Sequence, residues 1–403
     1  MKGRPVERVV VVGGGVLGAM HAVSARERGC DVVHLEREAD ARGASVRNFG
    51  LVWVSGRRGG AELELALRAR ERWEALAARI GGLGFRAHGS ITVASSDAEL
   101  RVLAEAAARP DAERRRYELL SPEAVRAVNP ALRGEYAGGL LCRRDAIVEP
   151  RQVPRAIREY LLGGGNGAHQ GREGDERQSG RGNPRADGGD AARAGGYRWW
   201  PGREVVEVGP NAVRDQTGEW HRGDLVILCT GAAHSGLVGG HLAGFAAPPV
   251  RRVRLQMMQT RPFPGRLSTS VADGDSLRYY PAYELPARER LGPQLPAAAR
   301  NNAQLLLVQR LDGGLTIGDT HEYDEPFAFD VDEDAYDHLR ARAEALLGGP
   351  IPPVQRRWAG VYSQLTQDGL YHRSQVAPGV ILVTGPGGRG MTCSPAIAEE
   401  TFG

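Results

Sequence analysis

Three glycines near the start of the chain have the spacing of a turn that binds a dinucleotide. An apolar run at residues 8–12 predicts a buried strand, and Gly13, Gly15 and Gly18 follow it at the entrance to an expected helix. Gly13 permits the tight turn, Gly15 lets the backbone approach a pyrophosphate, and Gly18 allows the helix to pack closely on the strand. The spacing alone is a weak signal, but its place between a strand and a helix makes it specific.

An acidic residue completes this pattern at the end of the next strand. The apolar run 31–35 ends at Glu36, about 20 residues after the turn. We expect Glu36, with Arg37 beside it, to contact a ribose, and the N–H groups of Val16 and Leu17 to face the phosphates. A carboxylate at this position disfavours a 2′-phosphate, so the sequence predicts FAD or NAD rather than NADP.

A second glycine-bounded run favours FAD over NAD. Within it, Ser45, Arg47 and Asn48 offer hydrogen-bond donors, and Gly50 closes the run. Donors placed soon after the ribose-binding strand suit a second phosphate and an extended flavin.

A third glycine-rich run, 385–392, lies near the end of the chain, before a helix expected from about Ser394. The partial positive charge of that helix suits the flavin edge that becomes negative on reduction. The alternative is a loop that serves only as a turn. The residues expected at the flavin here are Gly387, Gly388, Arg389, Gly390, Met391 and Thr392.

The remaining pattern predicts further elements around this site. We expect helices at 61–80, 121–128 and 332–347, and strands at 90–94, 138–142, 204–208, 224–229, 251–260, 304–318 and 381–384. Residues 163–196 are rich in glycine and charge and contain no Leu, Ile, Val, Met, Phe or Trp. Such a segment buries too little apolar area to order itself, so we expect a disordered insertion.

Composition excludes several classes of protein. The 403 residues carry a net charge of only +3, which argues against a nucleic-acid binder. No apolar run is long enough to span a bilayer and the N-terminus is not a signal peptide, so we expect a cytoplasmic protein with no membrane partner. Its four cysteines are far apart, so we expect no metal site. Lys2 is the only lysine, which removes lysine-based mechanisms.

These motifs together resemble the D-amino-acid-oxidase-type flavoprotein superfamily, which includes glycine oxidase and monomeric sarcosine oxidase. The likeness also rests on Val148-Glu149-Pro150, Cys229-Thr230-Gly231 and Trp358-Ala359-Gly360-Val361-Tyr362. Some segments, such as Arg254-Leu255-Gln256-Met257-Met258, are similar to a branch proposed to act on aminophosphonates.

The resemblance implies an α/β fold, α+β overall, in which a Rossmann-like FAD-binding domain is interleaved with a smaller antiparallel-sheet substrate domain. The implied FAD-binding domain comprises residues 1–85, 145–240 and 355–403, and the substrate domain comprises 86–144 and 241–354. Val205, Thr230 and Gly231 join the implied cofactor residues. The implied reaction is hydride transfer to the flavin from a carbon bonded to an amine nitrogen, after which the imine hydrolyses.

Candidate substrate residues follow from the same resemblance. Tyr279 and Tyr280 are expected on a strand with side chains on opposite faces, so only one, preferably Tyr280, should reach the substrate. His321 is expected at a strand end, either in the site or merely solvated. Arg389 is a candidate cation for the flavin or the substrate.

Two departures from the family's pattern change these expectations, and one basic cluster leaves two interpretations open. Thr316 and Thr392 stand where relatives have lysines, so Arg389 or Arg47 would have to bind the acidic group. No cysteine lies near 358–362, so we expect non-covalent FAD. The basic cluster at Arg251, Arg252 and Arg254 is either an oxyanion site or a solvated strand edge.

The function indicated is FAD-dependent oxidation of a small amine that bears an acidic group, either an amino acid or an aminophosphonate. Oxygen or an electron carrier would accept the electrons. One alternative is a flavin monooxygenase, which would need NAD(P)H, but no second dinucleotide motif is evident. Another is an FAD-binding subunit of a multi-subunit dehydrogenase, which would bind FAD without being reduced by any amine.

Overall fold

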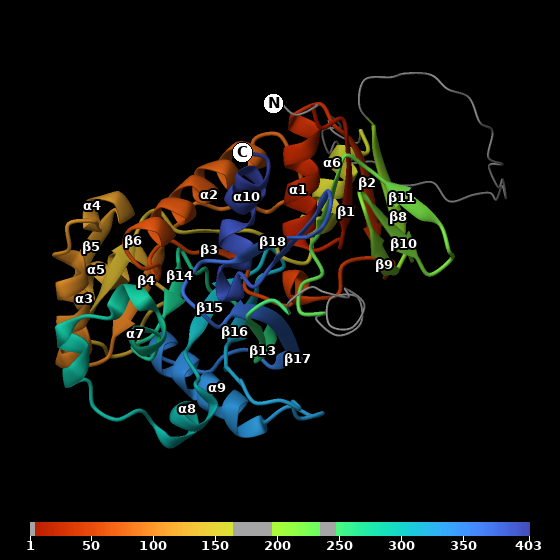
Figure 1. The fold of residues 1–403 in the computed structure, drawn as a ribbon. Coiled ribbons are helices and arrows are strands. Elements are labelled where there is room, and N and C mark those ends of the chain that lie inside the picture. Colours follow the sequence, from red (N-terminus) through yellow and green to blue (C-terminus); the bar gives the residue numbers. More distant parts are fainter. Residues whose placement is uncertain (1–4, 164–195, 234–246) are drawn as a thin grey trace, which may run out of the picture.

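The computed structural model describes residues 5–163, 196–233 and 247–403. Apart from Gly163 and Gly196, the insertion expected at 163–196 lies outside the described residues. Within these ranges the chain forms two large sheets with helices packed against them (Figure 1).

A six-stranded sheet in the described residues contains the predicted glycine motif. Its strands pair in parallel except for the outermost, β18, which is antiparallel to β19. The order is β18 (His372–Ala377), β19 (Val380–Thr384), β12 (Leu225–Leu228), β1 (Arg8–Val12), β2 (Asp31–Glu36) and β8 (Tyr197–Pro201). β1 is almost wholly apolar because it lies inside this sheet and is buried on both faces.

The alternation of side chains along β1 produces three layers (Figure 1). Val9 and Val11 face a helical layer, whereas Val10 and Val12 face a three-stranded sheet. The helices are α1 (Val16–Glu27), α2 (Ala61–Ala77) and α10 (Gly390–Thr401). The small sheet has the order β11 (Trp220–Arg222), β10 (Ala212–Asp215) and β9 (Val205–Gly209).

The second large sheet has eight strands in the described ranges and is antiparallel except between β14 and β4. Its order is β17 (Val354–Leu365), β13 (Val250–Pro262), β16 (Gly314–Gly318), β15 (Leu306–Gln309), β14 (Ser270–Ala272), β4 (Ser90–Ala94), β6 (Gly138–Cys142) and β5 (Tyr117–Leu120). β17, which the sequence assigned to the FAD-binding domain, pairs along its length with β13 in this sheet. The expected domain boundaries stay a prediction.

The two faces of this sheet have different neighbours. Leu307 and Ile317 pack with Leu339 and Leu346 of α9 (Glu333–Leu347), which covers one face. Leu306, by alternation, belongs to the opposite cluster, which faces the interior of the molecule.

Short elements connect the sheets. The two-stranded pair is β3 (Leu51–Val52) and β7 (Ala146–Ile147). The other helices are α3 (Asp97–Ala107), α4 (Ala112–Arg115), α5 (Pro122–Val128), α6 (Val153–Leu161), α7 (Ser276–Tyr279) and α8 (Pro296–Asn301). Single 3₁₀ turns occupy Ala44–Val46, Pro281–Tyr283, Pro286–Arg290 and Gly387–Arg389.

The expected strand at Tyr279 and Tyr280 is wrong. Tyr279 ends α7, and Tyr280 links that helix to the 3₁₀ turn that begins at Pro281. Proline has no N–H to give to a strand ladder, and the backbone turns there instead. The expected separation of the two rings onto opposite faces therefore does not hold.

The expected start of the last helix is also wrong. α10 begins at Gly390, four residues before Ser394, and contains Pro395 in its interior. A proline leaves the carbonyl four residues earlier without its helical partner. That carbonyl belongs to Met391, and it accepts a hydrogen bond from the indole Nε1 of Trp73 at 3.0 Å. The helix tolerates Pro395 because α2 supplies the missing donor.

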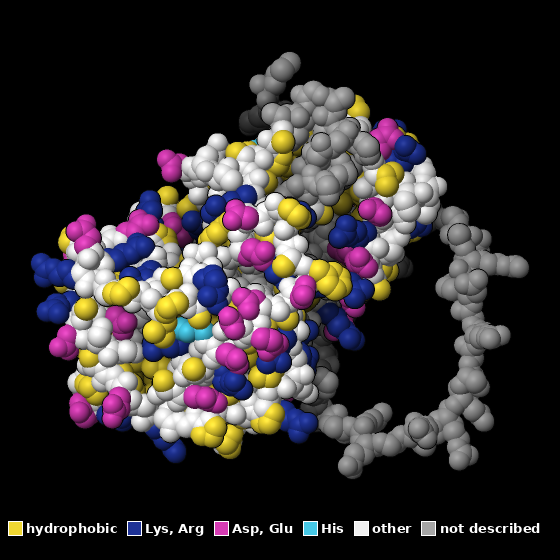
Figure 2. All heavy atoms as spheres, turned by 90° about the horizontal axis from the view of Figure 1, so that it is seen from below, with side chains coloured by type: hydrophobic (Ala, Val, Ile, Leu, Met, Phe, Trp, Pro, Cys, Tyr) yellow, Lys and Arg dark blue, Asp and Glu magenta, His cyan; other side chains and the backbone are white. Residues whose placement is uncertain are grey.

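The surface supports no inference of a charged partner on the face that Figure 2 shows. Basic and acidic side chains are interspersed there, without a continuous basic patch. No helix in the described ranges is both long and apolar enough to cross a membrane.

We predict that Gly18→Ala destabilises the protein. A Cβ at Gly18 would lie 1.9 Å from the carbonyl oxygen of Gly13, and this backbone atom cannot move without displacing the turn. Overpacking of this kind costs about 1–3 kcal/mol. Urea unfolding of the purified holoenzyme measures the loss.

The matched control is Gly81→Ala, because an added Cβ at Gly81 meets no atom within 4 Å. Equal unfolding midpoints for the two variants would show that the close approach of α1 to the turn contributes nothing to stability.

Candidate functional site

Four strand ends meet at one edge of the six-stranded sheet. β1, β2, β12 and β19 are mutually aligned in parallel, so the segments that follow them lie at the same edge. A cavity of about 1280 Å³ begins there and continues to the inner face of the eight-stranded sheet. Ligand sites in open parallel sheets lie beyond the carboxyl ends of the strands.

The glycine turn is shaped by close backbone contacts. Gly13 has φ +106°, and a Cβ there would meet the carbonyl oxygen of Cys229 at 2.3 Å. Gly15 lies directly before α1 and lines the cavity, and a Cβ there would meet the hydroxyl of Ser45 at 2.9 Å. Gly18 lies behind the turn, so its role is the predicted close packing and not contact with the cavity.

Glu36 and Ser45 hold this turn in place from the cavity side. Glu36 accepts hydrogen bonds from the N–H groups of Gly14 at 2.6 Å and Glu38 at 3.0 Å. The Ser45 hydroxyl accepts from Val16 N at 2.9 Å, at the first residue of α1. A carboxylate and a hydroxyl thus face the cavity beside the helix N-terminus.

The polar side chains of residues 43–50 are used mainly within the protein. The Asn48 amide donates to the carbonyls of Ala44 and Ser45 and accepts from Gly50 N at 2.6 Å. Arg47 donates from Nη1 to the carbonyl of Ala359 at 2.9 Å. Asn48 therefore stabilises its own turn, and Gly50 lies outside the cavity lining.

The final glycine-rich segment forms the opposite wall. Gly387, at φ +59°, and Gly388 lie in a 3₁₀ turn before α10, and both line the cavity. Thr392 does not line it. Its hydroxyl donates to Leu51 O at 3.1 Å and accepts from Trp53 N at 2.9 Å, which ties α10 to the segment after β3.

The lining fits an extended dinucleotide. The volume exceeds the roughly 300–1,000 Å³ of a typical small-molecule site. The hydroxyl of Thr230 is buried, lies on the cavity wall and lacks a hydrogen-bond partner among the described residues. A bound ligand with polar groups would satisfy it, because buried polar atoms are rarely left unpaired. The residues present therefore fit FAD.

A buried ion-pair network that the sequence did not reveal lies beside Gly388. Glu62, in the first turn of α2, accepts from Arg389 Nε at 2.7 Å and lies 3.6 Å from Arg57 Nη1. Burial opposes ionisation of Glu62, but the two arginines outweigh it and hold its pKa below its usual range. Two guanidinium groups against one carboxylate leave one unit of positive charge at this wall.

A group of aromatic rings forms the far end of the cavity. The ring of Tyr279 is 4.1 Å from that of His321, nearly parallel to it, and 5.0 Å from that of Tyr280. The Tyr279 hydroxyl lies 3.3 Å from that of Tyr362. Burial raises the pKa of Tyr279 and of Tyr280 above its usual range. Both phenols stay neutral near pH 7 and can donate hydrogen bonds.

His321 is buried and not solvated at a strand end. Its Nδ1 lies 3.1 Å from the carbonyl oxygen of Asn302. A carbonyl only accepts hydrogen bonds, so Nδ1 carries a proton and Nε2 is the nitrogen that remains. Nε2 lies 3.8 Å from the carboxylate of Asp319.

The structure brings most of the predicted residues to one cavity. Those that line it are Gly13, Gly15, Val16, Leu17, Glu36, Arg37, Ser45, Arg47, Asn48, Val205, Thr230, Gly231, Tyr280, His321, Gly387, Gly388, Arg389, Gly390 and Met391. Those that do not are Gly18, Gly50 and Thr392. The sequence missed Arg57 and Glu62 as lining residues, because no local motif marks them.

The arginine cluster at 251–254 lies in a part of β13 that pairs along one side with β17, whereas β16 pairs with residues 257–262. On the other side of the cluster, Arg254 forms an isolated bridge with Glu322. Arg252 pairs with Glu325 and Arg254 with Glu322, while Arg251 stacks on Tyr323 at 4.2 Å. Of the three, Arg252 lines the cavity. These interactions account for the charges without a bound oxyanion.

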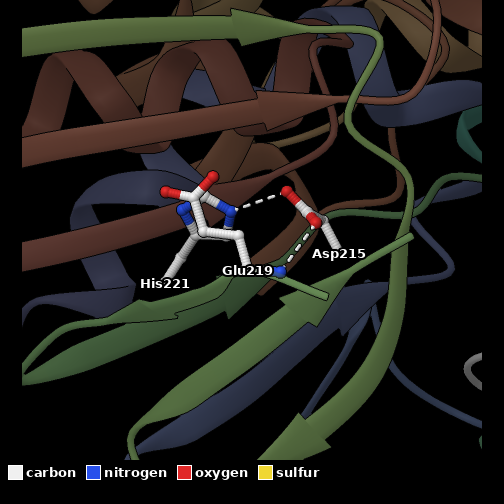
Figure 3. A group of neighbouring side chains, drawn as sticks. All are labelled: Asp215, Glu219 and His221. Atoms are coloured by element: carbon white, nitrogen blue, oxygen red, sulfur yellow. Dashed lines mark hydrogen bonds and ion pairs between the residues drawn. The ribbon is translucent and has the colours of Figure 1, made fainter. Parts of the chain in front are cut away.

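One group of side chains outside the cavity has the residue types of a metal site. Asp215, Glu219 and His221 lie together on the three-stranded sheet, as Figure 3 shows. His221 Nε2 is 2.9 Å from Asp215, and Arg203 donates to Asp215 at 2.7 Å and to Glu219 at 3.1 Å. Because a guanidinium already occupies the space between the carboxylates, the cluster is an ion-pair network.

Comparison with known proteins places this fold. The chain is similar to glycine oxidase from Geobacillus kaustophilus, at 19% identity over 97% of this chain and 93% of that one, with a TM-score of 0.68. L-proline dehydrogenase from P. horikoshii is 17% identical over 98% of this chain and 92% of that one, with a TM-score of 0.71. L-α-glycerophosphate oxidase from Mycoplasma pneumoniae, solved with FAD bound, is 15% identical over 99% of this chain and 94% of that one, with a TM-score of 0.69.

These likenesses show the fold, and no curated protein matches the chain significantly in sequence. A family model described as FAD dependent oxidoreductase matches residues 8–402. Because this match covers nearly the whole chain, the chain belongs to the DAO family of FAD-dependent oxidoreductases.

Proposed function

We propose that this enzyme oxidises the carbon–nitrogen bond of a small amine that bears an acidic group, either an amino acid or an aminophosphonate. The observation that carries the proposal is the closed end of the FAD cavity. There, neutral tyrosines and His321 lie near the Arg57–Glu62–Arg389 network, which has one positive charge in excess. Glycine oxidase and L-proline dehydrogenase, which share this fold, act on amino acids by their names.

The residues at this end have separable tasks. Arg57 and Arg389 attract the acidic group, and their planar forks suit two oxygens of a carboxylate or phosphonate. The hydroxyls of Tyr279 and Tyr280 donate hydrogen bonds and hold the substrate against the wall. FAD, when bound, accepts the hydride from the carbon next to the nitrogen. Burial of the rings limits access of water to the reacting carbon.

We propose non-covalent binding of FAD, with oxygen or an electron carrier as the final acceptor. Among the four cysteines, Cys229 lines the cavity, and burial raises the pKa of its thiol far above the usual range. A thiol kept protonated is a poor nucleophile. Its place beside Gly13, at the glycine turn, also puts it at the end remote from the tyrosines.

The test is anaerobic reduction of the purified holoenzyme by a panel of amines. The panel contains glycine, sarcosine, D-amino acids, 2-aminoethylphosphonate and an amine without an acidic group. We expect loss of absorbance near 450 nm with one class of acidic amine and not with the non-acidic amine. Reduction by NADPH alone, with no response to any amine, would replace this proposal with the monooxygenase. Readmitted air separates an oxidase from a dehydrogenase.

We predict that Glu36→Ala weakens FAD binding by about tenfold or more, because hydrogen bonds to a charged group contribute about 1.5–3 kcal/mol. Titration of the apoprotein with FAD, followed by flavin fluorescence, gives the dissociation constant. Glu74→Ala removes an exposed carboxylate of α2 that pairs with Arg70 and serves as the control. Equal affinities of the two variants for FAD would show that Glu36 does not contribute to FAD binding.

We predict that Arg57→Gln raises the concentration of acidic amine needed for half-maximal flavin reduction by about tenfold or more. Arg58→Gln is the matched control, since Arg58 is exposed, pairs with Glu284 and does not line the cavity. Both variants must first be shown to retain FAD. If the two variants show the same dependence on substrate concentration, the acidic group does not bind at the wall formed by Arg57.

A further inference from the structure

Asp319 occupies a defined place at the closed end of the cavity. It follows β16 and faces Gln304, with which it exchanges backbone hydrogen bonds at 2.8 and 3.0 Å. Its carboxylate is buried, with the residue 6% exposed, and it lines the cavity. The backbone pairing fixes the carboxylate against the wall that ends in His321.

This carboxylate has few partners for its charge. Gln304 donates to it from Nε2 at 3.2 Å, and His321 Nε2 lies at 3.8 Å. Within the described ranges no arginine lies within ion-pair distance of it. Burial therefore raises the pKa of Asp319, because desolvation outweighs the help of His321 and Gln304. A cation that entered the cavity would supply the positive charge that the described residues do not place beside Asp319.

Three other carboxylates on the cavity wall are already engaged. Glu62 interacts with Arg57 and Arg389, and Asp275 lies 3.8 Å from Arg278. Glu36 accepts two backbone N–H groups at the glycine turn. Asp319 differs from these three because the nearest ionisable partner of its carboxylate is the imidazole of His321, whose Nε2 lies at 3.8 Å.

Asp319 and Arg57 act on the same two phenols from different walls. Burial raises the pKa of Tyr279 and of Tyr280, the nearby charge of Asp319 adds to this rise, and the charge of Arg57 opposes it. Arg57 comes from the segment before α2 and reaches towards the Gly388 carbonyl at 3.4 Å. Asp319 comes from the hairpin of the other sheet. A negative and a positive group therefore flank the tyrosines.

We infer that Asp319 binds the nitrogen of the substrate as a cation and selects amines over the corresponding alcohols. The inference rests on the proposed function and adds a second point of recognition to it. The ammonium group donates hydrogen bonds to the carboxylate of Asp319, which Gln304 holds in position. The acidic group of the same molecule lies towards Arg57. A zwitterion meets both charges, whereas a hydroxy acid leaves Asp319 without a cation.

The experiment compares binding of matched probes to oxidised holoenzymes. The pairs are glycine with glycolate, and 2-aminoethylphosphonate with 2-hydroxyethylphosphonate. Binding is read from the change in the flavin spectrum after anaerobic rapid mixing, before any reduction. Asp319→Asn removes the charge and keeps the shape. Asp324→Asn is the control, since Asp324 is exposed, lies five residues further along the chain and is absent from the lining of this cavity.

In the probe pair that the wild type binds better, we expect Asp319→Asn to weaken binding of the amine by about tenfold or more. Binding of the hydroxy analogue should weaken much less. Asp324→Asn should change neither. Asp319→Ser gives the same comparison if the asparagine variant does not retain FAD.

Two outcomes overturn the inference and are distinguishable. If an amine reduces the wild-type flavin but both probes of its pair lose affinity equally in the Asp319 variants, Asp319 does not read the nitrogen, while the proposed function stands. If the wild type neither binds nor is reduced by any amine, the proposed function fails and the inference fails with it.

Discussion

The parallel alignment of β1 with β2 and β12, and of β12 with β19, is the constraint on which the proposed FAD site depends. Parallel strands place their carboxyl ends at one edge, so segments distant in the chain meet there. The glycine turn follows β1, Glu36 ends β2, Thr230 follows β12 and Gly387 follows β19. None of these groups binds a dinucleotide alone. The sheet assembles them because its apolar strands can be buried only side by side.

The closed end of the cavity depends on contact between the two sheets. Gly360 of β17 lies so close to Arg47 that an added Cβ would be 3.2 Å from its carbonyl oxygen. Arg47 donates to Ala359 O, and Trp358 Nε1 donates to Arg47 O at 3.2 Å. These bonds fix the 3₁₀ turn after β2 against β17. The tyrosines and Asp319, which belong to the second sheet's side, are thereby held at a set distance from the FAD segments.

The sequence predicted what local pattern determines. The strands at 8–12, 90–94 and 138–142 have the expected bounds, because each is a short apolar run between turn residues. The start of α10 escaped prediction because the glycine-rich run 385–392 was expected to precede the helix, and the bond from Trp73 that lets the helix tolerate Pro395 is a tertiary contact. Arg57 and Glu62 carry no motif. Their place at the cavity arises only when the start of α2 and the start of α10 come together, which spacing along the chain does not encode.

Arg57 and Arg389 are arginines, whose guanidinium groups do not exchange protons at physiological pH. Under the proposed function they therefore attract the acidic group without taking a proton from it or giving one to it. Burial keeps Tyr279 and Tyr280 protonated, so they donate hydrogen bonds but do not act as bases. At the opposite wall, His321 Nε2 lies 3.8 Å from the carboxylate of Asp319. Under the proposed function, the arginines orient the substrate through its acidic group, and the carboxylate of Asp319 faces its nitrogen.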